Sequence, residues 1–308
     1  MSPKGAVGNL NRAKTVAEMR RRMAGLTSAE GDRRAAAFQP RPSDVIIATY
    51  PKSGTTWMQQ IVHGLRSGGS MDFDEITEAV PWIELAHDLG HDLDADQGGP
   101  PRAFKSHKFG GDIQPGCRYI AIIRDPKDVA VSFFHFFKGW YFEPGAISLD
   151  TFIREFFLFG SDSGRYWPHL ISWWNRRADE DTLLLCYEDM KADLPAAVRR
   201  VADFLGYANC LATIDIVIRQ ASIEFMRDHG RQFDDHLIHD ARDAASLLPP
   251  GTGASKLGTS GNREILTPEL QAILDETWRD EIEATLGYAS YAALRADIAF
   301  PIERVDQP

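Results

Sequence analysis

One octamer of this chain combines the residue types that bind a phosphate. Residues 50–57 read Tyr-Pro-Lys-Ser-Gly-Thr-Thr-Trp, follow the apolar run 45–48 and precede a helical pattern. At such a strand-turn-helix junction the first backbone N–H groups are unpaired, and the helix dipole adds positive potential. A glycine admits an anion close to the backbone, while lysine and hydroxyl groups add donors. The octamer therefore predicts an anion site whose candidate residues are Lys52, Ser53, Gly54, Thr55, Thr56 and, for its ring face, Trp57.

The register of the octamer differs from that of the common nucleotide-binding loop. That loop reads G-x-x-x-x-G-K-[ST], and its Ser or Thr holds a magnesium ion. Here Lys52 precedes the glycine, and no earlier glycine stands in register. A simpler alternative is a helix that a Ser or Thr side chain caps after a buried strand. The octamer resembles the phosphosulfate-binding loop of the cytosolic-type sulfotransferases, which use 3'-phosphoadenosine 5'-phosphosulfate (PAPS).

A second group of candidate residues ends another predicted strand, at Lys105, Ser106 and His107. A histidine can accept a proton near neutral pH, although a lone histidine is more often a capping or hydrogen-bonding residue. The segment is similar to the Lys-Thr-His motif of the same family, with Ser106 in place of threonine. The resemblance implies that His107 is the general base for the acceptor hydroxyl and that Lys105 helps to hold the sulfuryl group. It also implies that Lys52 meets the charge on the departing phosphate oxygen.

The third group lies in residues 119–132, which predict another strand, turn and helix. Arg124 ends the strand, and Ser132 lies about one turn beyond the start of the helix. An arginine binds phosphate through paired hydrogen bonds, and a nearby serine adds another. The alternative is that Arg124 pairs with Asp125 or Asp128 at the helix N-terminus. The spacing is similar to that of the family's 3'-phosphate segment, which implies that Arg124 and Ser132 bind the 3'-phosphate of PAPS.

Two further segments resemble the part of the family that contacts adenine. Residues 187–190 read Tyr-Glu-Asp-Met, and residues 221–226 are similar to a Thr-Ser-Phe-x-x-Met motif, with alanine and isoleucine as departures. Tyr187 could also be a core residue whose hydroxyl reaches the surface. The resemblance implies an adenine site formed by Tyr187, Trp57, Ser222 and Met226.

The last nucleotide segment of the family departs most from its usual form. The family reads Arg-Lys-Gly-x-x-Gly-Asp-Trp-Lys, whereas residues 256–263 read Lys-Leu-Gly-Thr-Ser-Gly-Asn-Arg. The glycine frame is kept, so backbone N–H groups could still bind phosphate. The resemblance makes Lys256 and Gly258 candidate nucleotide residues and leaves Arg263 to compensate for the missing basic side chain.

Alternating element types predict the fold class. Short apolar runs at 45–49, 102–106, 119–123 and 183–187 alternate with helical patterns at 55–65, 128–137, 149–157, 166–177, 195–205 and 268–285. This order favours a single α/β domain with a central, mainly parallel sheet flanked by helices, and ligands at the carboxyl ends of its strands. We expect an N-terminal arm over 1–43, with a short helix near 15–23, that packs on the outside or trails in solvent. The domain proper then covers 44–308, with a flexible loop or lid over 228–256.

Composition excludes several classes of protein. The chain has 308 residues, 44% hydrophobic and 25% charged, as ordinary globular proteins do, and its formal net charge of -10 argues against a nucleic-acid partner. Three scattered cysteines and the absence of a signal-like segment predict a cytoplasmic location. No apolar run is long enough to predict integral membrane association. His87 and His91, beside Asp88 and Asp92, are only a weak metal pattern, and we expect no metal.

The family resemblance covers about 44–278, with its motifs in the family's order. It implies transfer of a sulfuryl group from PAPS, as co-substrate, to a hydroxyl or amine of a small-molecule acceptor, with 3',5'-ADP as product. Aromatic residues crowd 133–142 and 152–174; most should be core, and some should line an apolar acceptor pocket, where His135 is a competing base. An ATP-dependent phosphotransferase of related fold and a catalytically idle nucleotide-binding protein are the alternatives. No dimerisation motif is recognised, so the oligomeric state stays open.

Overall fold

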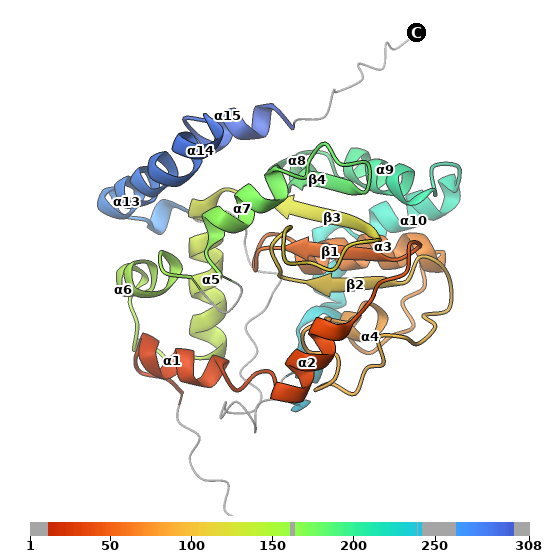
Figure 1. Ribbon diagram of the computed structural model, residues 1–308, viewed down its shortest axis with the longest axis horizontal. Coiled ribbons are helices and arrows are strands. Elements are labelled where there is room, and N and C mark those ends of the chain that lie inside the picture. The colour runs from red at the N-terminus through yellow and green to blue at the C-terminus, as the bar shows by residue number, and fades with distance from the viewer. Residues whose placement is uncertain (1–11, 161–163, 239, 242–262, 299–308) are drawn as a thin grey trace, which may run out of the picture.

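Four parallel strands form the centre of the computed structural model (Figure 1), which describes residues 12–160, 164–238, 240–241 and 263–298. The strands are β1 (Val45–Thr49), β2 (Ala103–Ser106), β3 (Arg118–Ile123) and β4 (Thr182–Cys186), in the order β2-β1-β3-β4. All three neighbouring pairs are parallel. Each strand is buried almost throughout, which explains why each reads as a continuous apolar run. The predicted α/β class and parallel sheet are confirmed.

Two helical layers cover the sheet because alternate strand residues point to opposite faces. Ile46 and Ala48 pack in one core with residues of α5 (Pro126–Trp140), α7 (Tyr166–Trp174) and α13 (Pro268–Trp278). Val45 and Ile47 pack in the other core. The helices of that second layer are α3 (Thr55–Ser67), α9 (Leu194–Leu205) and α10 (Leu211–Gln220). In Figure 1 the arrowheads of β1, β2 and β3 point toward α5, so the carboxyl edge of the sheet faces that helix.

Most predicted elements agree with the structure within a few residues. The predicted helix 149–157 is α6 (Leu149–Phe152) followed by a π-helix, η1 (Ile153–Phe157). The predicted helix 268–285 is α13, a π-helical turn η4 (Arg279–Glu283) and α14 (Ala284–Leu286). The fourth strand ends one residue earlier than expected, because Tyr187 begins α8 (Tyr187–Ala192). Helices that the sequence pattern missed are α8, α10, α2 (Ala29–Ala37), α4 (Ile76–Ala79), α11 (Ile223–Asp228) and α15 (Tyr291–Ala296).

The N-terminal segment packs into the protein, so the expectation that it trails in solvent is wrong for the described residues. Its helix α1 (Val16–Met23) lies where the sequence predicts one, and Val16 and Met19 are buried in the core. The backbone of Ala13 bonds to Tyr141 and Glu143, just beyond α5. The ring of Phe38 meets Phe104 of β2 edge to face, with centroids 5.0 Å apart. This segment therefore belongs to the same core as the sheet.

The predicted loop over 228–256 is partly helical where it is described. Gly230–Phe233 forms a 3-10 turn, η2, and residues 236–238 are helical. Residues 239 and 242–256 lie outside the described residues. In the part of the chain that is described, no helix has both the length and the apolar character needed to cross a bilayer.

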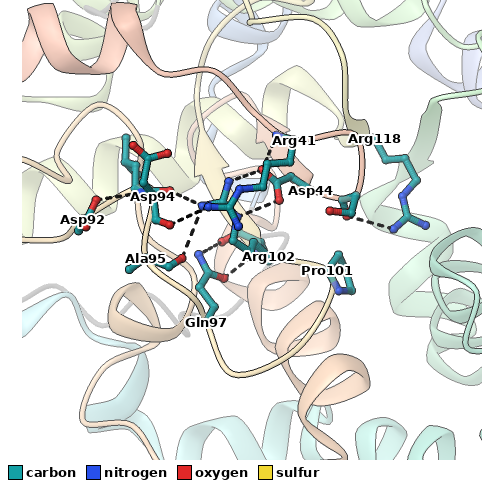
Figure 2. Close-up of polar contacts among 12 residues, drawn as sticks. Arg41, Asp44, Asp92, Asp94, Ala95, Gln97, Pro101, Arg102 and Arg118 are labelled. Carbon is teal, nitrogen blue, oxygen red and sulfur yellow. Dashed lines mark hydrogen bonds and ion pairs between the residues drawn. The ribbon is translucent and has the colours of Figure 1, made fainter.

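A buried ion pair joins the amino ends of β1 and β2 (Figure 2). The Arg102 guanidinium donates to both carboxylate oxygens of Asp44, at 3.0 and 2.6 Å, and the two side chains are 5% and 0% exposed. Arg102 also donates to the Leu93 carbonyl at 2.6 Å, and the Arg41 N–H donates to Asp44 at 2.7 Å. Because both charges are buried and hydrogen-bonded, removing either one leaves the other without compensation.

We predict that Asp44→Ala lowers the free energy of unfolding by about 3–5 kcal/mol, since it strands the Arg102 charge. Glu30→Ala is the matched control, because its pairs with Arg33 and Arg34 are exposed and should contribute little to stability. Urea denaturation followed by circular dichroism measures both variants. Equal, small losses would show that the Asp44–Arg102 pair does not stabilise the junction of β1 and β2.

Candidate active site

A cavity of about 1010 Å³ opens at the carboxyl edge of the sheet. It brings together predicted site residues that lie far apart in the sequence, after the ends of β1, β2, β3 and β4. The predicted residues that line it are Lys52, Gly54, Thr55, Thr56, Trp57, Lys105, His107, Arg124, Ser132, Tyr187, Ser222 and Met226. Ser53 is fully buried beside the cavity, and Lys256 and Gly258 lie outside the described residues.

The loop after β1 adopts an uncommon backbone conformation that leaves its helix end without a side-chain cap. Lys52 and Gly54 both have positive φ, 69° and 104°. A Cβ at Gly54 would lie 3.0 Å from the Tyr187 ring, so glycine is required there for conformation and for space. Helix α3 begins with Gly54 as its N-cap, and no side chain caps it. The alternative of a Ser- or Thr-capped helix is therefore wrong.

Hydroxyl groups of this loop differ in their surroundings. Thr55 Oγ1 lies 2.5 Å from Thr49 Oγ1, which ties the start of α3 to the end of β1. The Ser53 hydroxyl is buried and has no hydrogen-bond partner among the described residues. A buried donor of this kind, at an uncapped helix N-terminus, fits an anion ligand.

His107 is held as one tautomer. Its Nδ1 lies 2.7 Å from the Thr49 carbonyl oxygen, at the end of the neighbouring strand β1. A carbonyl oxygen only accepts, so Nδ1 carries the hydrogen, and in the neutral imidazole Nε2 then carries the lone pair. The imidazole therefore has the form of a base, at the wall of the cavity.

Two lysines of the cavity lie over aromatic rings. The Lys52 Nζ is 4.3 Å from the centre of the Phe136 ring, and the Lys105 Nζ is 3.9 Å from the centre of the Trp82 ring. Such ring faces attract ammonium groups. Both lysines thus add positive charge beside the loop and His107.

Arg124 lies between the loop and Tyr187 rather than against the nearby carboxylates. Its Nη1 donates to the Lys52 carbonyl at 2.7 Å, and its guanidinium carbon is 4.2 Å from the centre of the Tyr187 ring. Its Nε is buried without a hydrogen-bond partner among the described residues.

The alternative in which Arg124 pairs with Asp125 or Asp128 is wrong, because those carboxylates pair with another arginine. Arg263 contacts Asp125 at 3.3 Å and Asp128 at 3.1 Å. This pairing places Arg263 at the N-terminus of α5, the helix that carries Ser132.

The residues predicted to contact adenine lie close to one another beside the loop after β1. The rings of Trp57 and Tyr187 meet at 5.6 Å, and the Trp57 indole N–H donates to the Ala221 carbonyl at 2.7 Å. Ser222 caps α11 through a bond from the Phe225 N–H, and Met226 is buried beside it. These contacts hold the four predicted adenine residues in one cluster at the wall of the cavity.

His135 does not belong to the cavity wall. It lies on α5, and burial, helped by the charge of Lys138, lowers its pKa. Because it is not among the residues lining the cavity, His107 is the better placed base.

Sequence reasoning missed several residues of the cavity. Met23, Leu26 and Asp32 come from the N-terminal segment, and Trp82 and Glu84 come from the connection between α4 and β2. Trp82 reaches the site through an isolated bridge with Lys105, which has no sequence pattern of its own. Among the described residues no three His, Cys, Asp or Glu side chains form a metal-ligand group, and Asp88 accepts a hydrogen bond from the Ser28 N–H instead.

The comparisons with known proteins agree with this architecture. A family model described as Sulfotransferase domain matches residues 42–285. Sulfotransferase 1E1 of Cavia porcellus is 32% identical over 204 residues, 63% of this chain and 69% of that protein. Sulfotransferase 2A6 of Rattus norvegicus is 31% identical over 233 residues, 73% of this chain and 79% of that protein.

Solved structures share the fold. A retinol dehydratase in complex with androsterone and the inactive cofactor PAP superposes with a TM-score of 0.66 and 22% identity, covering 81% of this chain and 83% of that one. Mouse sulfotransferase SULT7A1 complexed with PAP gives 0.65 and 22%, covering 85% and 92%. The architecture is that of an α/β protein with its site at the carboxyl edge of a parallel sheet. The chain belongs to the sulfotransferase-domain family.

We predict that Gly54→Ala destabilises the fold more than Gly68→Ala does. Both glycines have positive φ, so each substitution should cost about 1 kcal/mol for conformation. A Cβ at Gly68 meets nothing within 4 Å, whereas at Gly54 it is pressed against the Tyr187 ring. Guanidinium denaturation should therefore show an additional loss of about 1–3 kcal/mol for Gly54→Ala. Equal losses would contradict the close approach of the loop to Tyr187.

Proposed function

We propose that this protein is a sulfotransferase that moves a sulfuryl group from PAPS to a hydroxyl or amine of a small apolar or aromatic acceptor. The observation that carries the proposal is the His107 tautomer: a base with its Nε2 lone pair in the same cavity as the uncapped α3 N-terminus. The presence of PAP in the two solved structures of similar fold supports the choice of donor.

On this proposal, each part of the donor has its own residues. The N–H groups of the loop, with Thr55 and Thr56, bind the 5'-phosphate. Arg124 and Ser132 bind the 3'-phosphate, for which the buried Arg124 Nε is a ready donor. Tyr187, Trp57, Ser222 and Met226 line the adenine slot. Arg263, already at the start of α5, offsets the negative charges of Asp125 and Asp128 near that subsite.

The transfer step needs a base and a stabilised leaving group. His107 Nε2 takes the acceptor proton as the acceptor oxygen bonds to sulfur, and the bond from sulfur to the bridging phosphate oxygen breaks. Lys52 meets the charge that grows on that oxygen, Lys105 holds the sulfuryl group, and 3',5'-ADP leaves. A sulfuryl group carries one charge fewer than a phosphoryl group, so lysines can take the place that a metal has in phosphoryl transfer.

An apolar acceptor fits the remaining wall of the cavity. That wall is built from aromatic side chains of α5 and its C-terminal end: Phe133, Phe136, Phe137, Trp140 and Tyr141. Apolar walls with few polar groups favour phenols, sterol-like alcohols and lipids over free sugars. Androsterone in one of the similar solved structures and retinol in another are bound molecules of this kind. We also propose a cytoplasmic location, as in the cytosolic-type family.

We predict that 3',5'-ADP raises the melting temperature clearly more than 5'-ADP or ATP with magnesium does. The expected reason is that only 3',5'-ADP fills the Arg124 and Ser132 subsite. Arg124→Met should weaken 3',5'-ADP binding about 10- to 100-fold, since a charged hydrogen bond is lost, and should remove most of its advantage over 5'-ADP. Stabilisation by ATP with magnesium as strong as by 3',5'-ADP would favour a phosphotransferase.

We predict that His107→Ala lowers the turnover of any accepted substrate about 10²- to 10⁴-fold, the usual contribution of a general base. Binding of 3',5'-ADP should stay within about threefold, because the proposed base contacts the acceptor. His135→Ala is the control and should keep its turnover. Retained turnover in His107→Ala would show that another group is the base, and an unaltered protein that binds 3',5'-ADP without turning over any acceptor would favour the idle alternative.

A further inference from the structure

The Trp82 side chain contacts both Lys105 and His107, the residues to which the proposed function assigns sulfuryl binding and proton transfer. The Lys105 Nζ lies 3.9 Å from the centre of the Trp82 ring. The rings of Trp82 and His107 meet nearly at right angles, with centroids 5.0 Å apart and an interplanar angle of 83°. All three side chains line the cavity.

Backbone bonds fix the place of Trp82 relative to Lys105. The Lys105 N–H donates to the Pro81 carbonyl at 2.8 Å, and the Ile83 N–H donates to the Lys105 carbonyl at 2.9 Å. Residues on both sides of Trp82 are therefore paired with the outer edge of β2 through one parallel bridge. The position of the Trp82 indole at the strand end is therefore set by these backbone bonds as well as by its own rotamer.

Glu84 ties the same segment to the residue between Lys105 and His107. The Ser106 hydroxyl donates to Glu84 Oε1 at 2.5 Å and accepts a bond from the Lys108 N–H at 3.1 Å. Burial raises the pKa of the Glu84 carboxyl, against the opposing effects of Ser106 and Lys108. The turn from Lys105 to Lys108 and the segment from Pro81 to Glu84 thus form one hydrogen-bonded unit.

A lysine that binds a reacting group must hold its ammonium at one position in the cavity. The ammonium sits on a flexible four-carbon stem, so many of its positions would be unproductive. Among aromatic side chains, tryptophan offers the most favourable face to a cation. Confining the ammonium and the imidazole against one indole would hold both at fixed positions relative to the reacting groups.

We propose that Trp82 is a positioning residue for sulfuryl transfer, which acts through Lys105 and His107; this rests on the proposed function. Trp82→Leu should lower kcat about tenfold, as loss of one cation–π contact in a partly desolvated site allows. The KM for PAPS should stay within about twofold. Trp82→Phe should recover most of the lost turnover, because it restores an aromatic face.

A double-mutant cycle with Lys105→Met separates positioning from general packing. If Trp82 acts through the Lys105 ammonium, the loss caused by Trp82→Leu should shrink at least about threefold once that ammonium is gone. The matched control is Trp278→Leu, a buried tryptophan that bonds to the Tyr288 carbonyl and does not line the cavity. Its effect should combine multiplicatively with that of Lys105→Met. If the kcat losses of Trp82→Leu and Lys105→Met also multiply in the double mutant, the positioning role is overturned.

An NMR measurement tests the contact independently of turnover. The Hε signal of Lys105, identified by its loss in Lys105→Met, should be shifted upfield by the Trp82 ring current in the unaltered protein. The shift should vanish in Trp82→Leu and persist in Trp278→Leu. A Lys105 signal at its ordinary position would overturn the positioning role even in an active enzyme. An unaltered protein that shows the shift but transfers no sulfuryl group would instead overturn the proposed function.

Discussion

A single hydrogen bond between two strand ends orients His107, the proposed base. His107 Nδ1, just beyond β2, donates to the Thr49 carbonyl at 2.7 Å, on the last residue of β1. The Thr49 hydroxyl contacts Thr55 at the start of α3. The base and the helix N-terminus are thus anchored to the same residue, and the parallel register of β1 and β2 sets their separation. A change at that junction would disturb the proposed proton acceptor and the proposed anion-binding loop together.

The loop after β1 is built against ordinary backbone preferences. A lysine in the left-handed region is unfavourable, and such strain is found where the surrounding structure requires it. Here the carbonyl of Lys52 accepts the Arg124 guanidinium, so the conformation links the end of β1 to the end of β3. Tyr187, which follows β4, lies under the same guanidinium and against Gly54. Residues that follow three strands therefore hold one another in place at one edge of the sheet.

The sequence predicted the sheet well because buried parallel strands are continuous apolar runs between helical patterns. It also predicted that the candidate site residues lie at one edge of the sheet, since the carboxyl ends of parallel strands meet there, and most of them line one cavity. The sequence did not predict the site residues whose positions depend on tertiary contacts. Trp82 joins the site through one backbone bridge, and the N-terminal segment, rich in alanine and arginine, gives little sign that Met23 and Leu26 reach the cavity. The alternative pairing of Arg124 with Asp125 or Asp128 could not be decided from the sequence, because Arg263, far along the chain, pairs with both carboxylates.

The most direct measurement follows the label of ³⁵S-PAPS during incubation with a panel of phenols, sterols, aliphatic alcohols and amines. Transfer of a sulfuryl group predicts a labelled acceptor and 3',5'-ADP formed in equal amounts, without added metal. Release of 3',5'-ADP with only inorganic sulfate, or no release with any acceptor, would contradict the proposal that His107 activates an acceptor for transfer of the sulfuryl group.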